Sequence, residues 1–172
     1  MNYDFVIIGS GPAGSTLSWK LAKSGFKIAL IDRADYQKKR LVNDFFCPYV
    51  NKITKFYTPV FSNQLGGNSA LWHGKVYLIS KKEFNTSNWG FSYEELVKNS
   101  DELANNFKLD KNSLTHIENK DGRSYHSSYR SKINNVYDFL KINNIKNIDV
   151  FKGHSPTELC FNDKKVNKII TE

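Results

Sequence analysis

The sequence predicts an α/β fold built on a parallel sheet, from three observations in its first 32 residues. A continuous apolar run at 5–8 is typical of a strand that is covered on both faces. A glycine-rich turn follows directly, Gly9-Ser10-Gly11-Pro12-Ala13-Gly14, and leads into a segment of helical periodicity. A second apolar run at 27–31 then ends on Asp32. This order of strand, turn, helix, strand and acid indicates a Rossmann-like, dinucleotide-binding unit rather than an ordinary βαβ unit.

Each glycine of the turn has a separate expected role. Gly9 permits a tight turn, Gly11 lets the backbone approach a pyrophosphate, and Gly14 lets the helix pack close to the strand. The phosphates would lie on unpaired N–H groups at the helix N-terminus, where the helix dipole favours negative charge. Asp32 is placed to accept hydrogen bonds from a ribose diol. These residues alone leave both NAD and FAD open as the ligand.

The helix after the turn is expected to bury one apolar face and to end near residue 25. Ala13, Leu17 and Leu21, with Ala22 beside them, follow helical spacing. Gly25 stands where a glycine commonly terminates a helix.

Composition places the 172-residue chain among globular proteins, since 40% of its residues are hydrophobic and 14% are aromatic. Its net charge of +8 would suit a nucleic-acid partner, but the lysines are interleaved with acids and no recognition motif accompanies them. We therefore expect no nucleic acid as a partner.

The cysteines and the apolar runs limit the kinds of site and the cellular location that we expect. Cys47 and Cys160 have no metal-ligand spacing and form no disulfide framework, so we expect no metal and a reducing compartment. The first strand begins almost at Met1, and no apolar run approaches the roughly 20 residues of a membrane span. A cytoplasmic location is the expectation.

The middle of the chain shows less regular patterning. Residues 33–64 lack sustained periodicity and suggest an irregular excursion over the surface. A Gly66-Gly67 pair then lets the backbone approach a flat ligand or another chain segment, with Asn68 and Ser69 beside it. The alternative for 65–74 is a simple turn followed by a strand.

The rest of the chain predicts helices and a hairpin. Ser92 and Glu95 form a capping box for a helix that continues to about residue 107, with Phe91 and Leu96 as a hydrophobic staple. Further predictions are a polar stretch at 108–130, a helix at 131–143, a strand at 147–151, and a hairpin of 159–161 and 166–170 that turns at Asn162-Asp163.

Three motifs together resemble the glucose–methanol–choline (GMC) oxidoreductases, which are FAD enzymes. They are Gly-Ser-Gly-Pro-Ala-Gly-Ser at 9–15, Leu-Gly-Gly-Asn-Ser-Ala-Leu-Trp-His-Gly at 65–74, and Trp-Gly-Phe-Ser-Tyr-Glu-Glu-Leu at 89–96. Their order and separation are also similar to that family, particularly to its bacterial branch associated with sugars and surface polysaccharide. The likeness covers roughly residues 3–107 well and the remainder more loosely.

The resemblance implies FAD as the cofactor and a role for each motif. The first turn would hold the pyrophosphate, while Asp32 would bind the adenosine ribose and Arg33 would lie along the adenine. The second motif would pass along the flavin, residues 35–64 would cover the cofactor, and Ser155-Pro156 would bring backbone to the adenine. The predicted cofactor-binding residues are Gly9, Ser10, Gly11, Pro12, Ala13, Gly14, Ser15, Asp32, Arg33, Gly66, Gly67, Asn68, Ser69, Trp72 and Gly74.

The resemblance further implies hydride transfer to the flavin from a CH–OH group of an alcohol or sugar. Family members are much longer and carry a catalytic histidine, with a His or Asn partner, near their C-terminus. Nothing at 75–172 resembles that part, so no catalytic residue is assigned. We expect an incomplete Rossmann-like FAD-binding domain of residues 1–34 and 145–172, with an inserted irregular and helical region at 35–144.

Two alternatives remain open. In the first, the chain is a non-catalytic fragment or a split-enzyme subunit that binds FAD and needs a C-terminal partner chain or self-association. Half of such a domain leaves the edge of the sheet and apolar faces uncovered, which favours association. In the second, the chain is an NAD-dependent dehydrogenase, since Asp32 suits NAD equally well. On the preferred interpretation, the 172-residue chain alone is expected not to turn over substrate.

Overall fold

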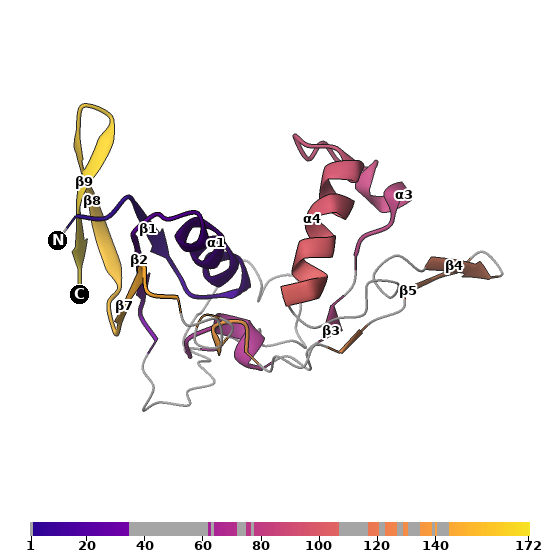
Figure 1. The fold of residues 1–172 in the computed structure, drawn as a ribbon, viewed down its shortest axis with the longest axis horizontal. Helices are drawn as coiled ribbons and strands as arrows, with labels where there is room; N and C mark the ends of the chain where they lie inside the picture. Colours follow the sequence, from indigo (N-terminus) through magenta and orange to yellow (C-terminus); the bar gives the residue numbers. More distant parts are fainter. Residues whose placement is uncertain are drawn as a thin grey trace, which may run out of the picture. The chain divides into compact units, whose positions relative to one another are not determined.

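The computed structural model describes residues 2–34, 62, 64–71, 75–76, 78–106, 117–120, 123–126, 129–130, 135–138, 140 and 145–172. The chain forms two compact units, Met1–Leu71 with Asn135–Glu172, and Trp72–Asn134 (Figure 1). The chain therefore leaves the first unit after Leu71 and returns to it at Asn135. Nothing in the described ranges is a helix both long and apolar enough to cross a membrane.

The first unit contains a three-stranded parallel sheet in the order β1-β2-β7. Its strands are β1 (Phe5–Ile8), β2 (Ile28–Asp32) and β7 (Ile148–Lys152). The register pairs Val6 with Ala29 and Ala29 with Asp149. The predicted α/β class with a parallel, Rossmann-like sheet is confirmed, and the carboxyl ends of all three strands lie at one edge of the sheet.

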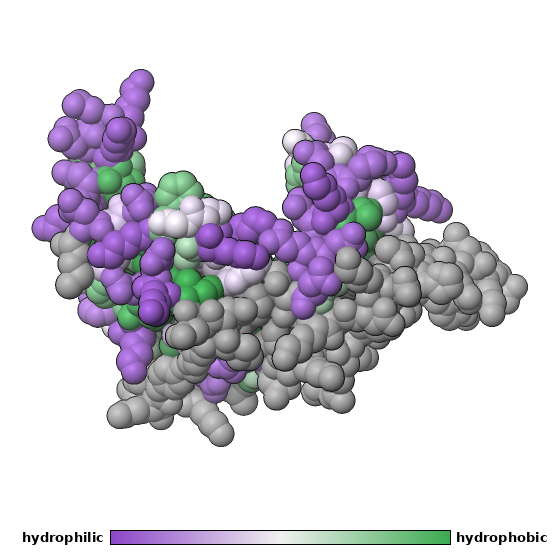
Figure 2. All heavy atoms as spheres, viewed as in Figure 1, coloured by the Kyte–Doolittle hydropathy of each residue, from purple (hydrophilic) through white to green (hydrophobic). Residues whose placement is uncertain are grey.

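Burial in the sheet is concentrated in its central strand. Ile28 and Leu30 of β2 are 0% exposed, whereas Phe5 and Ile8 of β1 are 42% and 54% exposed. The expectation that β1 is covered on both faces is therefore wrong within the described part of the chain, since side chains on both of its faces reach solvent. Among the described strands, β2 alone pairs with β1, which leaves its other edge unpaired there. Figure 2 shows hydrophobic residues reaching the surface of this unit among hydrophilic ones.

Helix α1 (Pro12–Lys23) packs on one face of the sheet (Figure 1). The predicted apolar face is wrong in part, since Ala13 and Leu17 are exposed and only Ala22 of that set is buried. The buried positions are Ser15, Ser18, Trp19 and Ala22. Small serine side chains allow the helix axis to approach the strands closely, which the larger Leu17 would prevent.

Gly14 marks the closest approach of α1 to β1. A Cβ atom built on Gly14 would collide with the carbonyl oxygen of Gly9 and lie 3.3 Å from Cγ2 of Ile7. A Cβ on Gly11, one turn earlier, meets no atom within 4 Å. Close helix–strand packing therefore requires glycine at position 14 and leaves open space at position 11.

A glycine turn ends helix α1. At the end of α1, Gly25 has φ +94°, its N–H donates to the carbonyl of Ala22, and the Phe26 N–H donates to that of Leu21. This pattern is a Schellman motif, so the predicted glycine terminator is confirmed.

A β-hairpin follows β7 along the chain (Figure 1). Its strands are β8 (Pro156–Asn162) and β9 (Lys165–Thr171), paired antiparallel. The turn lies at Asp163 and Lys164, with φ +45° and +67°, one residue later than predicted. Positive φ at both central residues is typical of a type I′ turn, whose twist matches that of a hairpin.

The second unit contains the predicted capped helix, α4 (Tyr93–Asn106). The Ser92 N–H donates to Oε2 of Glu95 at 2.8 Å, and the Glu95 N–H donates to Oγ of Ser92 at 3.1 Å, so the predicted capping box is confirmed. A second capping box, Ser80 with Glu83, begins the short α3 (Lys81–Phe84). Phe84 is buried, and its ring contacts those of Trp89, Phe91 and Tyr93.

Short strands in this unit escaped the sequence prediction. β4 (Ile117–Lys120) pairs with β5 (Arg123–His126), and β3 (Lys75–Val76) pairs with β6 (Tyr129–Arg130). The polar composition of 108–130 hides the alternation on which strand prediction depends. Most of the predicted helix at 131–143, and the predicted cover over most of 35–64, lie outside the described residues.

Replacing Gly14 with alanine is expected to destabilise the first unit by about 1–3 kcal/mol, because the new methyl group collides with backbone. Chemical denaturation of Gly14→Ala measures the loss. Gly11→Ala is the matched control in the same turn, and its smaller loss is expected because its Cβ enters open space. Equal losses in the two variants would contradict the packing argument.

The start of α4 is expected to loosen in acid. The backbone hydrogen bond from Ser92, helped by the Ser92 hydroxyl, holds the pKa of Glu95 below its usual value. A lowered carboxyl pKa stabilises the folded form at neutral pH, and this contribution is lost as the pH falls through the folded-state pKa. Cα chemical shifts of residues 93–96, followed by NMR during acidification, report the loosening.

Two variants isolate the capping carboxylate. Glu95→Gln should remove the acid-dependent change at residues 93–96 that belongs to the capping box. Glu94→Gln should leave it, because Glu94 pairs with Lys81 at 2.9 Å instead. A Glu95→Gln titration identical to that of the unmodified chain would refute this assignment.

Candidate functional site

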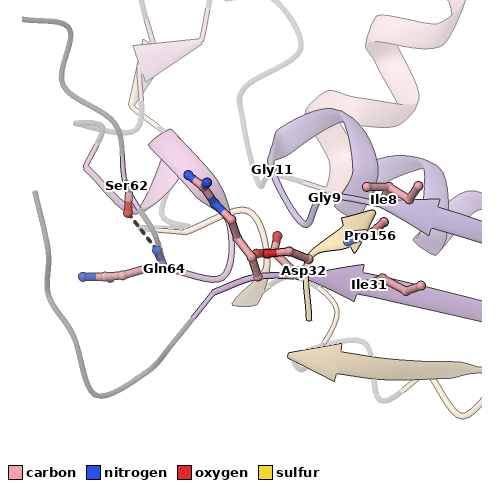
Figure 3. Close-up of a pocket in the computed structure, with 11 residues that line it drawn as sticks. Ile8, Gly9, Gly11, Ile31, Asp32, Ser62, Gln64 and Pro156 are labelled. Atoms are coloured by element: carbon pink, nitrogen blue, oxygen red, sulfur yellow. Dashed lines mark hydrogen bonds between the residues drawn. The ribbon is translucent and has the colours of Figure 1, made fainter. Parts of the chain in front are cut away.

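A cavity of about 430 Å³ lies at the carboxyl ends of β1 and β2, within the first unit (Figure 3). This volume falls in the range of small-molecule sites, about 300–1,000 Å³. Parallel α/β sheets bind ligands at this edge of the sheet. Its lining residues are Ile8, Gly9, Gly11, Ile31, Asp32, Arg33, Ser62, Gln64, Gly67, Ser155 and Pro156.

The glycine turn forms the wall of the cavity at the end of β1. Gly9 has φ +92°, which favours glycine, and its N–H donates to the carbonyl of Ile31 at 2.8 Å. Gly11 is the N-cap of α1 and provides no side chain to satisfy the first-turn N–H groups. Those donors, the helix dipole and the open space at Gly11 together suit an anionic group such as a pyrophosphate.

Asp32 occupies the end of β2, between the glycine turn and Gln64 in Figure 3. Its Oδ2 accepts a hydrogen bond from the Ser10 N–H at 2.5 Å, and its Oδ1 accepts one from the Ala34 N–H at 2.7 Å. A carboxylate offers about four lone-pair positions. Two backbone hydrogen bonds therefore orient the side chain and leave acceptor capacity for hydroxyl groups of a ligand.

Other predicted residues of the turn lie behind the cavity wall. Ser10 and Ser15 are 0% exposed, and the Ser15 hydroxyl donates to the carbonyl of Ser10 at 2.6 Å. Pro12 and Ala13 are exposed on the first turn of α1. The two serines support the shape of the turn. Gly9, Gly11 and Asp32 line the cavity, whereas Gly14 does not.

One residue of the Gly66-Gly67 pair, Gly67, lines the same cavity from a separate segment of the chain. Gly66 has φ +94° and Gly67 has φ +55°, and residues Gly67–Ala70 form a 3₁₀ turn, η1. Gly67 lines the cavity, whereas Ser69 is buried behind it and the exposed Asn68 accepts a hydrogen bond from the Ser62 N–H. Trp72 and Gly74, also predicted to bind cofactor, lie outside the described residues.

Sequence reasoning missed Ser62 and Gln64 as lining residues. The Gln64 N–H donates to the Ser62 hydroxyl at 3.2 Å, which fixes the approach to Gly66-Gly67. Neither residue belongs to a recognisable motif, so only the fold reveals them. Ser155 and Pro156, by contrast, were singled out by the family resemblance, and both line the cavity. Their expected role beside an adenine stays a prediction. Among the described residues, no group of three His, Cys, Asp or Glu side chains is arranged to hold a metal.

Comparison with known proteins supports the fold of this region. Residues 7–36 match the family described as NAD(P)-binding Rossmann-like domain. Geranylgeranyl diphosphate reductase of Rhodobacter capsulatus is 45% identical over 64 residues, which cover 31% of this chain and 16% of the reductase. The match therefore spans only a small part of that relative.

Solved structures share the fold over nearly the whole chain. Pyridoxine 4-oxidase from Mesorbium loti superimposes with a TM-score of 0.57 at 15% identity, over 99% of this chain and 46% of the oxidase. The Mycobacterium smegmatis Sdh1 complex gives 0.52 at 15% identity, over 98% and 30%. This chain thus spans less than half of either structure, and its first unit has the Rossmann-like fold of dinucleotide-binding domains.

Proposed function

We propose that the chain is the FAD-binding part of an oxidoreductase of the glucose–methanol–choline kind, acting on a CH–OH group of an alcohol or sugar. One observation carries the proposal: Gly11, Asp32 and Gly67, from three separate segments, line one cavity at the carboxyl edge of a parallel sheet. The two glycine motifs of the family resemblance are thereby brought together. FAD, when bound, would supply the hydride acceptor for oxidation of the alcohol.

The residues of the cavity fit a dinucleotide. First-turn N–H groups of α1 would hold the pyrophosphate beside the open space at Gly11. The spare acceptor positions of Asp32 would take the ribose hydroxyls, and Arg33 and Pro156 would flank the adenine end. Gly66 to Ser69, with Trp72 and Gly74, would follow the flavin side.

Two of the relatives named above are redox enzymes, an oxidase and a reductase, which favours an oxidoreductase. The chain spans only part of each, so activity, alcohol or sugar substrate and electron acceptor remain proposals for the whole protein. The NAD(P) description of the family matched by residues 7–36 favours a second candidate, an NAD-dependent dehydrogenase.

The alternative in which the chain needs a partner chain or self-association is supported by the exposed apolar strand β1. Phe5, Val6 and Ile8 are 40–54% exposed, and in the described part of the chain β1 pairs on one side only. An uncovered apolar edge of this kind favours pairing with another strand. The proposed partner is therefore a further chain or a second copy that supplies a strand beside β1.

The purified chain is expected to bind FAD in preference to NADH or NADPH, and Asp32→Ala is expected to weaken FAD binding at least tenfold. The loss follows from removing charge-assisted hydrogen bonds to ribose hydroxyls. Flavin absorbance retained after desalting and fluorescence titration measure both results.

Asp4→Ala is the matched control. The Asp4 carboxylate also accepts a backbone hydrogen bond, from the Lys27 N–H at 2.7 Å, but it lies at the amino end of the sheet and outside the cavity. Its replacement should leave FAD affinity unchanged. Binding of NADH or NADPH without FAD would instead establish the dehydrogenase candidate, and equal loss in both variants would refute the role of Asp32.

A further inference from the structure

One buried network of hydrogen bonds joins three segments that are distant in the sequence. The N–H of Gly66 donates to Oγ of Ser10 at 2.9 Å, although the two residues are separated by 56 positions. Ser10 is 0% exposed, so its hydroxyl faces the Gly66 peptide rather than the cavity. The hydroxyl of Ser10 therefore ties the second glycine motif to the first.

Asn135 holds the other side of the same peptide group. Its Nδ2 donates to the carbonyl oxygen of Leu65 at 2.7 Å, and that carbonyl belongs to the peptide unit whose N–H binds Ser10. Its Oδ1 accepts from the Tyr137 N–H at 2.9 Å. The Leu65–Gly66 peptide is thus fixed at its oxygen by Asn135 and at its nitrogen by Ser10.

Ser69 completes the network. Its hydroxyl donates to the carbonyl of Gly66 at 2.6 Å and accepts from the Val136 N–H at 3.1 Å. Ser69 is 2% exposed and Val136 is 1% exposed. Two consecutive backbone carbonyls, at 65 and 66, are therefore held by side chains, of which Ser69 is buried and Asn135 is partly buried.

Steric contacts show why this turn contains two glycines. A Cβ on Gly66 would collide with Oδ1 of Asn135, and a Cβ on Gly67 would lie 3.3 Å from Cα of Gly11. The turn is therefore enclosed between Asn135 on one side and the first glycine turn, at Gly11, on the other. Its position sets the separation of Gly67 and Gly11, which are both walls of the cavity.

We propose that Asn135 is a positioning residue for the dinucleotide: it fixes the Gly66-Gly67 turn against Gly11 and so sets the width of the binding cavity. The inference rests on the proposed FAD function. Asn135 does not line the cavity itself, and it acts through the Leu65–Gly66 peptide. An amide is required because one side chain must both donate to Leu65 and accept from Tyr137.

Asn135→Asp separates this role from a local one. Aspartate keeps the acceptor for the Tyr137 N–H but loses the donor to Leu65, and it places a carboxylate oxygen against a carbonyl oxygen. FAD affinity is expected to fall about tenfold, comparable to the loss of a hydrogen bond together with its unsatisfied partner. A residue that serves only the 135–137 turn would be replaced by aspartate without effect on affinity.

The test compares three forms of the full chain, unmodified, Asn135→Asp and Thr16→Ala, by FAD titration and by amide hydrogen exchange without cofactor. Thr16 is the control, because its hydroxyl makes a local, exposed hydrogen bond to Pro12 in the same helix that begins the site. In Asn135→Asp, the Gly66 N–H should lose protection while the central-strand N–H of Leu30 keeps it. Thr16→Ala should change neither protection nor affinity.

The two readouts keep the inference separate from the function on which it rests. If the unmodified chain takes up no FAD, the proposed function fails. Hydrogen exchange at the Gly66 N–H still tests whether Asn135 fixes the Gly66-Gly67 turn. Unchanged Gly66 protection in Asn135→Asp would overturn the positioning role. So would a parallel loss of protection at Leu30, since Asn135 would then be needed for the fold as a whole, and so would FAD affinity within twofold of the unmodified chain.

Discussion

The approach of α1 to β1 at Gly14 is the constraint on which the first unit depends. Any side chain at this position would meet the Gly9 carbonyl, so the helix lies against the strand with backbone touching backbone. The buried serines at positions 15 and 18 extend this close contact along the helix. Because the helix begins directly after the Gly9 turn, its N-terminus is aimed at the carboxyl edge of the sheet. The contact that packs the core therefore also builds the end of the cavity at which we propose that a pyrophosphate binds.

Asp32 joins the two strands of the site through its own hydrogen bonds. By accepting the N–H of Ser10, it holds the glycine turn of β1 against the end of β2. A carboxylate already oriented by two backbone donors loses little conformational freedom when a ligand arrives. The same side chain thus shapes the cavity and keeps acceptor positions for the hydroxyl groups of a ligand.

Local patterns in the sequence predicted much of this architecture, because they depend on neighbouring residues. Strands β1, β2 and β7, helix α1, the Gly25 terminator and the Ser92–Glu95 capping box were all predictable from short windows. The buried face of α1 was not predictable in this way. Leu17 has a higher hydropathy than serine, but the close contact of α1 with the sheet places the smaller Ser15 and Ser18 on the buried face. Likewise, the polar stretch that contains β4 and β5 gave no alternation by which to predict strands. The hairpin turn shifted by one residue because Asp163 and Lys164 both adopt positive φ.

Contacts between distant segments lay beyond sequence reasoning, and Asn135 is the clearest case. The glycine pair could be predicted to approach either a ligand or another chain segment, and the structure shows the approach to two other chain segments. Asn135 limits Gly66, whereas Gly11 limits Gly67. Asn135 is also the residue at which the chain re-enters the first unit after residues 72–134, and Leu71, where the chain leaves, follows directly on η1. The hydrogen bonds from Val136 to Ser69 and from Asn135 to Leu65 therefore join the two segments of the first unit between which residues 72–134 are inserted. Since the same turn forms a wall of the cavity, the point of insertion and the width of the cavity are fixed by one set of contacts.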